Sequence, residues 1–509
     1  MSDRHPVLSL ANGGAAPRET IPRLPLDAFR NLIIAGTKRG RRVAALFGSP
    51  TRNESIDLVV VLAADAEGLL ELASTNLTSK AFSSMTNDCP EVHLFEREIA
   101  EQWGLVPEGH PWLKPVRFQP PSGPAPDISG STVVARPTIG VTDYYRVEGE
   151  EAHEVAVGPV HAGVIEPGHF RFQCHGEQVF HLEISLGYQH RGVERALVGG
   201  PDKRTIHYSE TLSGDTTVGH ATAYCIVAES LARTRVPGRA LALRAVALEL
   251  ERLANHTGGL GALANDIGFL PTASFCGRLR GDFLNLSAVL CGSRFGRGLV
   301  RPGGTGFDAD TKRLQDMFTK LDAAYRDTEQ AVKLLWDTPS VMARLEDTGR
   351  VDPGVARQLG MVGVAARACG LKRDVRKTHP SGYYRFVHIP ISTWTTGDVF
   401  SRAYVRWLEI ERSVDFIRTQ LRQLPDGPVR APVGPLRGAH VAVSLVEGWR
   451  GEICHVALTD ENGRFSAYKV VDPSFHNWSG LAMALRDQQI SDFPLCNKSF
   501  DLSYCGHDL

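Results

Sequence analysis

A run of proline, glycine and serine interrupts the chain at Phe118–Gly130, FQPPSGPAPDISG, and no periodic pattern of apolar residues continues through it. This composition is typical of a linker. The chain has 509 residues, more than one hydrophobic core normally organises, so the break predicts at least two domains. We expect a disordered tail at 1–22, a small domain at 23–117, a linker at 118–150 and a large domain at 151–509.

The small domain reads as α+β. Arg41–Phe47 and Ile56–Ala64 are apolar runs with the length of strands, and the turn-rich GSPTRNES lies between them. A helical stretch is expected at Asp65–Ala73, and a short charged helix opens the segment Phe95–Leu113 before a Gly/Pro turn. Before this domain, the glycine and alanine content of the first residues favours disorder.

The large domain reads as a helical bundle with a β-hairpin at its entrance. His169–Ser185 alternates apolar and polar residues on either side of His175-Gly176-Glu177, which predicts the hairpin. Val246, Leu250 and Leu253 have helical spacing, and we expect that helix to stop at Gly258-Gly259. Apolar residues recur with helical spacing through Phe400–Leu421, which predicts one long helix. The predicted fold class is therefore α+β.

Composition excludes several classes of function. The formal net charge is -1, so there is no electrostatic case for binding nucleic acid. The longest apolar run near the N-terminus, Leu58–Ala64, is far shorter than the roughly 20 residues that cross a bilayer. The first residues have no apolar signal core, so we expect a cytoplasmic protein without a transmembrane helix.

The cysteines are scattered along the chain, and no two lie closer than nine residues. This spacing argues against a zinc ribbon and against a cluster held by a local Cys-x-x-Cys pair. Buried free thiols are expected, and any iron-sulfur cluster belongs to a partner subunit. No glycine-rich fingerprint of the G-x-G-x-x-G type occurs, so NAD chemistry also belongs elsewhere.

Eight of the eighteen histidines fall between His153 and His220. Histidine titrates near neutral pH and can relay protons or bind a metal. The loop Gly158–His169 contains glycines and prolines that would present His161 and Glu166 on a rigid scaffold. The segment Leu186–Leu197 places His190, Arg191, Glu194 and Arg195 on adjacent turns, and from the residues alone a solvated, charged helix start is the favoured interpretation.

Seven segments resemble, in order, the large subunit shared by respiratory complex I and the membrane-bound, energy-converting nickel-iron hydrogenases. They are GPVHAGVIEPGHFRF, LGYQHRGVE, LELERLANH with ALANDIGF, GVAARACGLKRDVRK, GDVFSRAYVRWLEIERS, VEGWRGEICH and DPSFHNW. Phe95–Leu113 resembles the small accessory subunit of complex I, fused here as in the formate hydrogenlyase large subunit. The resemblance implies a bundle docked on an iron-sulfur small subunit and on antiporter-like membrane-arm subunits, peripheral to the inner face of the cell membrane.

The departures from the family pattern concern the metal ligands. Hydrogenases of this family carry two cysteine pairs, and Ser213 and Thr216 stand where the first pair would be. Ser503 and Gly506 stand at the second pair, and Cys505 falls one position out of register. Soft thiolates are what hold a nickel-iron centre, so we expect neither that centre nor any covalently bound cofactor.

Two further positions follow from the resemblance. Complex I binds quinone in the same cavity with a histidine and a tyrosine; His161 matches the histidine, and Gly214 stands at the tyrosine. Glu194 matches the acidic residue that binds magnesium in hydrogenases, and His507 could stand for the histidine ligand. An ion pair between Glu194 and an arginine is the favoured alternative to magnesium.

The resulting hypothesis is an oxidoreductase subunit that passes electrons from a partner's cluster to an acceptor, with quinone as the candidate. The residues expected to act in catalysis are His161, Glu166, His169, His190, Arg191 and Glu194. The residues expected to line the quinone or former metal cavity are His161, Ser213, Gly214, Thr216, Ser503 and Cys505. The alternative is a scaffold or coupling subunit of the same type of complex, without catalysis.

Overall fold

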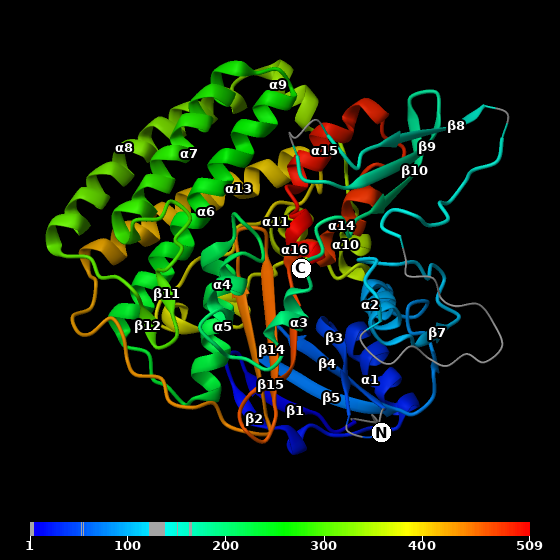
Figure 1. Ribbon diagram of the computed structural model, residues 1–509. Coiled ribbons are helices and arrows are strands. Elements are labelled where there is room, and N and C mark those ends of the chain that lie inside the picture. The colour runs from blue at the N-terminus through cyan, green and yellow to red at the C-terminus, as the bar shows by residue number, and fades with distance from the viewer. Residues whose placement is uncertain (1–4, 52, 54, 122–137, 150, 162–164) are drawn as a thin grey trace.

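The computed structural model describes residues 5–51, 53, 55–121, 138–149, 151–161 and 165–509. Helices and small, largely antiparallel sheets together confirm the α+β class. Figure 1 shows a bundle of long helices on one flank, the N-terminal sheet below, and a three-stranded sheet projecting on the far side. The C-terminus lies near the centre of the molecule, where these parts meet.

The N-terminal sheet has the strand order β1-β5-β4-β3 and is antiparallel throughout. The strands predicted around Arg41–Phe47 and Ile56–Ala64 are confirmed as β3 (Arg42–Pro50) and β4 (Ile56–Ala64). The helix predicted at Asp65–Ala73 is wrong. A turn that ends at Gly68, φ +68, leads instead into β5 (Leu69–Leu77), whose backbone pairs with β4 along its length.

The tail that we expected to be disordered instead pairs with both main sheets. Strand β1 (Leu8–Ala11) lies against β5, and β2 (Ala15–Pro17) lies against β13 (His440–Glu447). Of the segment predicted as a linker, 122–137 and 150 lie outside the described residues.

The bundle consists of α6 (Gly238–Asp266), α7 (Leu270–Cys291), α8 (Thr311–Trp336) and α13 (Val399–Arg422). Helix α13 confirms the long helix predicted at Phe400–Leu421. Helix α6 does not stop at Gly258-Gly259. A Cβ at Gly258 would lie 2.6 Å from Arg280 Cδ, and one at Gly261 would lie 2.7 Å from Cys276 Cβ. These glycines therefore let α7 approach closely rather than ending the helix.

The predicted hairpin is confirmed as β9 (His169–His175) and β10 (Gln178–Ser185), joined by β8 (Ala152–Val157) in the order β10-β9-β8. A further sheet has the order β15-β14-β13-β2, with β14 at Glu452–Thr459 and β15 at Phe465–Val471. The inner side chains of β13–β15 and of the N-terminal sheet form one continuous apolar core.

The remaining elements connect these layers. The helices are α1 (Leu26–Lys38), α2 (His93–Trp103), α3 (Val193–Leu197), α4 (Thr205–Glu210), α5 (Thr217–Leu231), α9 (Pro339–Leu345), α10 (Pro353–Gln358), α11 (Gly363–Ala368), α12 (Val375–Thr378), α14 (Pro473–Ala484), α15 (Phe493–Phe500) and α16 (Tyr504–Asp508). The strands are β6 (Ala81–Ser83), β7 (Val106–Glu108), β11 (Val300–Arg301) and β12 (Gly304–Thr305). Within the described residues, no helix combines the length and apolar character needed to cross a bilayer.

Candidate functional site

Three segments that are far apart in the sequence meet beside the C-terminus. The Ser213 and Ser503 hydroxyl oxygens are 2.9 Å apart, which joins the turn before α5 to the start of α16. The Glu166 carboxylate accepts a hydrogen bond from the Tyr504 backbone N–H at 3.2 Å. The structure thus brings together six predicted site residues: Glu166, Ser213, Gly214, Thr216, Ser503 and Cys505.

Asp215, which was not among the predicted site residues, contacts Ser213, Thr216 and Arg450 at this site. Its Oδ1 accepts hydrogen bonds from the hydroxyls of Ser213 at 3.0 Å and Thr216 at 3.1 Å. The Arg450 guanidinium binds both carboxylate oxygens, at 2.6 and 2.8 Å. Burial alone would raise the pKa of Asp215, but Arg450 outweighs it, and the pKa falls to about 2.

The donor set does not fit a nickel-iron centre. Ser213, Thr216 and Ser503 present hydroxyls, and these are hard donors already engaged in hydrogen bonds. A Cβ at Gly506 would lie 2.7 Å from the Asp472 carboxyl carbon, so no cysteine fits there unless Asp472 moves. We derive no chemical step through such a centre.

Cys505 is the nearest thiol to this hydroxyl cluster. Its sulfur lies 3.4 Å from the Ser503 hydroxyl. Burial and the adjacent Glu166 carboxylate raise the pKa of Cys505 to about 11, so the thiol stays protonated at neutral pH. A protonated thiol is a poor metal ligand and a poor nucleophile.

His161 lies on the loop that precedes the hairpin. Its Nε2 donates a hydrogen bond to the Gly168 carbonyl at 2.9 Å, and its ring packs beside Phe170 with 5.8 Å between ring centroids. The carbonyl partner places the proton on Nε2, so Nδ1 remains as the ring atom that can face an acceptor. Residues 162–164 of the loop lie outside the described residues.

Gly214 is exposed at the edge of the site. A Cβ built there meets no atom within 4 Å, so the position where the family tyrosine would stand opens on free space. The flanking residues Ser213 and Asp215 are held by hydrogen bonds. The Ser213 and Ser503 hydroxyls are therefore held in place, and the space beside them at Gly214 is open.

His190 and Arg191 clamp the C-terminus onto the site. His190 Nδ1 donates to the Asp508 carbonyl at 2.7 Å, and burial lowers the pKa of this histidine. The Arg191 guanidinium binds the carbonyls of Thr211 and Leu212 at 2.7 and 2.9 Å. Through these contacts, His190 and Arg191 position the C-terminal residues and the turn that carries Ser213.

His169 is fixed by its neighbours on the hairpin. Its Nδ1 donates to the Gly158 carbonyl at 3.2 Å, and its Nε2 accepts from Arg171 at 3.4 Å. Burial lowers the pKa of His169, which favours the neutral ring. Both ring nitrogens are thus engaged, and its role in catalysis remains a prediction.

Glu194 is paired with a lysine, and the arginine partner that we expected is wrong. Its carboxylate lies 3.0 Å from Lys469 Nζ, and it also accepts from the Val470 N–H at 2.9 Å. His507 turns its Nδ1 to the Asp508 carboxylate at 2.9 Å instead. Because Lys469 and the Val470 N–H already occupy the Glu194 carboxylate while His507 faces Asp508, the two residues do not fit a magnesium site.

A second polar network runs beneath the site. His220 lies 3.0 Å from Asp472 and 3.1 Å from His455, whose other nitrogen contacts the Tyr468 hydroxyl at 2.9 Å. All four side chains are buried. The partners of His220 could not be found from the sequence, because His455 lies on β14, Tyr468 on β15 and Asp472 at the start of α14.

Comparison with known proteins identifies the family. Residues 266–437 match the family described as "Respiratory-chain NADH dehydrogenase, 49 Kd subunit". The carbon monoxide-induced hydrogenase of Rhodospirillum rubrum is 32% identical over 354 residues, which are 69% of this chain and 97% of that protein. The chain belongs to the complex I and hydrogenase large-subunit family.

Other members of this family extend the comparison. Formate hydrogenlyase subunit 5 of Escherichia coli is 27% identical over 92% of this chain and 85% of its own length. Because the match covers 92% of this chain, it includes most of the N-terminal part as well as the large domain. NADH-quinone oxidoreductase subunit 4 of Thermus thermophilus is 28% identical over 69% of this chain and 92% of its own length. The family relatives are thus subunits of complex I-like and hydrogenase-type complexes.

The ion pair of Asp215 predicts a specific acid sensitivity. An aspartate whose pKa is about 2 when folded and about 4 when unfolded stabilises the fold fully above pH 4, and this contribution is lost as pH falls toward 2. We expect wild type to lose roughly 2 kcal/mol of its stability advantage over Asp215→Asn between pH 5 and pH 2. Urea denaturation across this range measures it.

The control for this prediction is Asp316→Asn, which removes an exposed carboxylate paired with Lys320 at 2.8 Å. Its stability difference from wild type should stay nearly constant over the same range. A constant difference for Asp215→Asn as well would contradict the depressed pKa.

Proposed function

We propose that this chain is the subunit of a membrane-associated, complex I-like oxidoreductase that passes electrons from an iron-sulfur partner to a quinone, without a nickel-iron centre. The observation that carries the proposal is the composition of the site. Ser213 and Ser503 present hydroxyls where thiolates would be needed, and the His161 imidazole lies on the loop that precedes the hairpin. The family relatives that include NADH-quinone oxidoreductase subunits support this acceptor class.

The chemistry requires protons as well as electrons. Reduction of a quinone to a quinol takes two electrons from the partner's cluster and two protons. His161 Nε2–H is held by the Gly168 carbonyl, so the ring would hydrogen-bond a quinone oxygen through a protonated Nδ1. The open position at Gly214 would receive the ring of the acceptor, and Arg191 would hold the turn that carries Gly214.

The partners are inferred in the same way. An iron-sulfur small subunit would supply the electrons, and antiporter-like membrane-arm subunits would anchor the assembly on the inner face of the membrane. The names of the formate hydrogenlyase and NADH-quinone oxidoreductase relatives support a multisubunit complex. No cofactor bound covalently to this chain takes part in the proposal.

A scaffold without catalysis is the second candidate. The observation in its favour is that the hydrogen bond from Ser213 to Ser503 and the bidentate Asp215–Arg450 pair tie together the segments that would surround a metal. A site whose segments are cross-linked in this way would couple the movements of partner subunits without binding an acceptor.

The test is quinone reduction by the whole complex, purified through an affinity tag on this chain. Reduced methyl viologen supplies electrons and decylubiquinone accepts them. We expect His161→Ala to lower turnover roughly 100-fold, the lower end of what a general acid contributes. Size-exclusion chromatography and the electron paramagnetic resonance signal of the partner's clusters verify assembly.

The matched control is His153→Ala, which removes an exposed histidine on β8 and should leave turnover unchanged. Equal turnover of wild type and His161→Ala would remove His161 from the mechanism. An assembled wild-type complex that reduces no quinone would favour the scaffold. Stoichiometric nickel in that complex would overturn the assignment of the hydroxyl site.

A further inference from the structure

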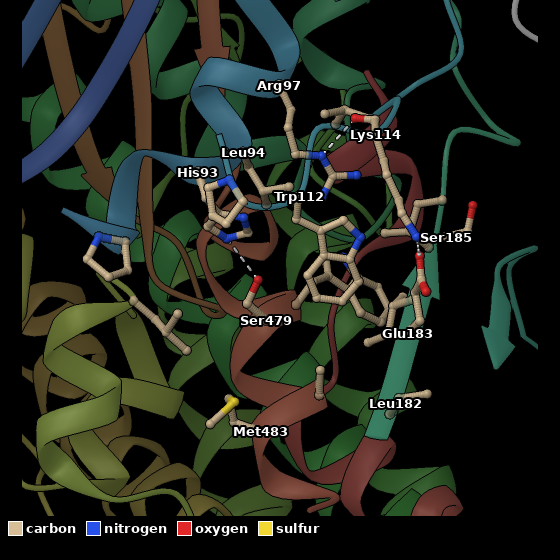
Figure 2. Close-up of a pocket in the computed structure, with 18 of the residues that line it drawn as sticks. His93, Leu94, Arg97, Trp112, Lys114, Leu182, Glu183, Ser185, Ser479 and Met483 are labelled. Atoms are coloured by element: carbon tan, nitrogen blue, oxygen red, sulfur yellow. Dashed lines mark hydrogen bonds and ion pairs between the residues drawn. The ribbon is translucent and has the colours of Figure 1, made fainter. Parts of the chain in front are cut away.

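A separate cavity of about 280 Å³ lies between the N-terminal part and the hairpin. It is bounded by α2, by the loop after β7, by β10 and by α14 (Figure 2). None of the residues that bring the candidate site together (Glu166, Ser213, Ser503 and Cys505) lines it. Its size is close to the lower end of pockets that hold small organic ligands.

Most of the cavity wall is apolar. Its large apolar side chains include those of Leu94, Trp112, Leu182, Leu359, Trp478 and Met483. Figure 2 shows the Trp112 indole at the centre of this wall, with Met483 and Leu182 beyond it. Walls of this kind fit the flat body of an apolar ligand.

Arg97 brings a positive charge into this apolar wall. Its Nε and Nη2 donate to the backbone carbonyls of Lys114 and Pro115, both at 2.8 Å. Among the described residues, its Nη1 has no hydrogen-bond partner, and no carboxylate pairs with the guanidinium. Burial lowers the pKa of Arg97 to about 10, so the group is still a cation at neutral pH.

The two carboxylates that act on Arg97 from a distance are already engaged. Glu183 binds Lys114 Nζ at 2.6 Å and accepts from the Tyr145 N–H at 2.8 Å. Glu101 accepts the backbone N–H groups of Arg117 and Gln119, both at 3.0 Å. Neither is free to serve as the counter-ion of Arg97.

The other titratable groups of the wall do not supply a negative charge. Burial lowers the pKa of all four histidines that line the wall, to about 3 for His93, and it also lowers the pKa values of His110, His181 and His507. His93 contacts the Ser479 hydroxyl at 3.0 Å. Arg486 lies exposed at the rim and adds a cation to those of Arg97 and Lys114. The wall therefore carries an excess of positive charge at neutral pH.

We propose that this cavity binds a small organic anion with a flat apolar body, whose acidic group pairs with Arg97 Nη1. A carboxylate or sulfonate matches the guanidinium, and a planar ring system matches the tryptophan and leucine walls. The inference concerns a site distinct from the quinone site, and it does not depend on the proposed function.

The test compares two probes that share one body. 8-Anilinonaphthalene-1-sulfonate carries an anionic group, and N-phenyl-1-naphthylamine has the same rings without it; both report binding by fluorescence. Titrations use the purified complex. We expect Arg97→Met to raise the Kd of the anionic probe at least about tenfold and to leave the Kd of the neutral probe within about twofold.

Two further variants keep the test decisive. Arg418→Met removes a guanidinium from the surface of α13, where it pairs with Asp322 at 2.7 Å, and should change neither Kd. Met483→Trp fills the cavity and should abolish saturable binding of both probes, which decides the matter if Arg97→Met fails to assemble. Equal binding of the anionic probe to wild type, Arg97→Met and Met483→Trp would overturn the proposal.

Discussion

Replacing Glu409 with glutamine is expected to lower the free energy of unfolding by about 3–5 kcal/mol, the cost of breaking a buried ion pair from one side. The Glu409 carboxylate is fully buried on α13. It contacts Arg367 at 2.7 Å, Arg376 at 3.2 Å and Arg252 at 3.3 Å, and it accepts from His256 at 2.7 Å.

The size of this effect follows from the charge balance of the cluster. Three buried guanidinium groups face Glu249, Asp374 and Glu409, and these three carboxylates have lowered pKa values. Burial raises the pKa of the fourth carboxylate, Glu447, to about 7, so that group is only partly ionised at neutral pH. Without the charge of Glu409, one arginine loses its compensation, and Glu447 should ionise more readily.

Glu411→Gln is the matched control, because Glu411 lies two residues further along the same helix and makes no ion pair among the described residues. Its effect should stay within about 0.5 kcal/mol, as for most surface substitutions. Urea denaturation of both variants at pH 7 measures the two changes. If Glu409→Gln lowered the free energy of unfolding as little as Glu411→Gln does, the cluster would contribute little net stability, as is known for some buried ion pairs.

The elements that could be predicted from the sequence are those whose pattern is local. Strands β3 and β4 are continuous apolar runs, and α13 repeats its apolar residues over its full length. Strand β5 was missed because its hydrogen bonds come from β4, while the preceding residues are charged and favour a helix locally. The glycines of α6 were misread because the reason for them is α7, which a window of sequence does not contain.

The site divides in the same way. The resemblance located Ser213 and Ser503, and the structure places their hydroxyls in contact although the residues are far apart in sequence. Asp215 was overlooked because its meaning depends on Arg450, which reaches it from the loop after β13. Glu194 was assigned a counter-ion of the wrong residue type, since only the fold brings Lys469 on β15 beside it. Ion pairs between residues that are far apart in the sequence are therefore the part of the site that could not be predicted.

Glu98 joins the N-terminal part of the chain to the C-terminal sheet. This residue of α2 is fully buried, and both its carboxylate oxygens lie 2.6 Å from Lys469 Nζ on β15. Arg117 pairs with the same carboxylate and also donates to the His507 carbonyl at 2.9 Å. Lysine and arginine outweigh the burial that would raise the pKa of Glu98, and they lower it.

Glu98→Gln should therefore deprive the buried cations Lys469 and Arg117 of the one carboxylate that both of them bind, and we expect the free energy of unfolding to fall by about 3–5 kcal/mol. The loss should fall on the contact between α2 and β15, so hydrogen exchange of α2 amides should accelerate more than that of α6. Glu67→Gln, which removes a half-exposed partner of Arg41 in the same N-terminal part, should cost at most about 1 kcal/mol. If both variants unfolded at the same urea concentration as wild type, the ion pairs of Glu98 would not be what holds α2 against β15. Because Lys469 also binds Glu194, the same variant tests whether this contact supports the segment that carries His190 and Arg191.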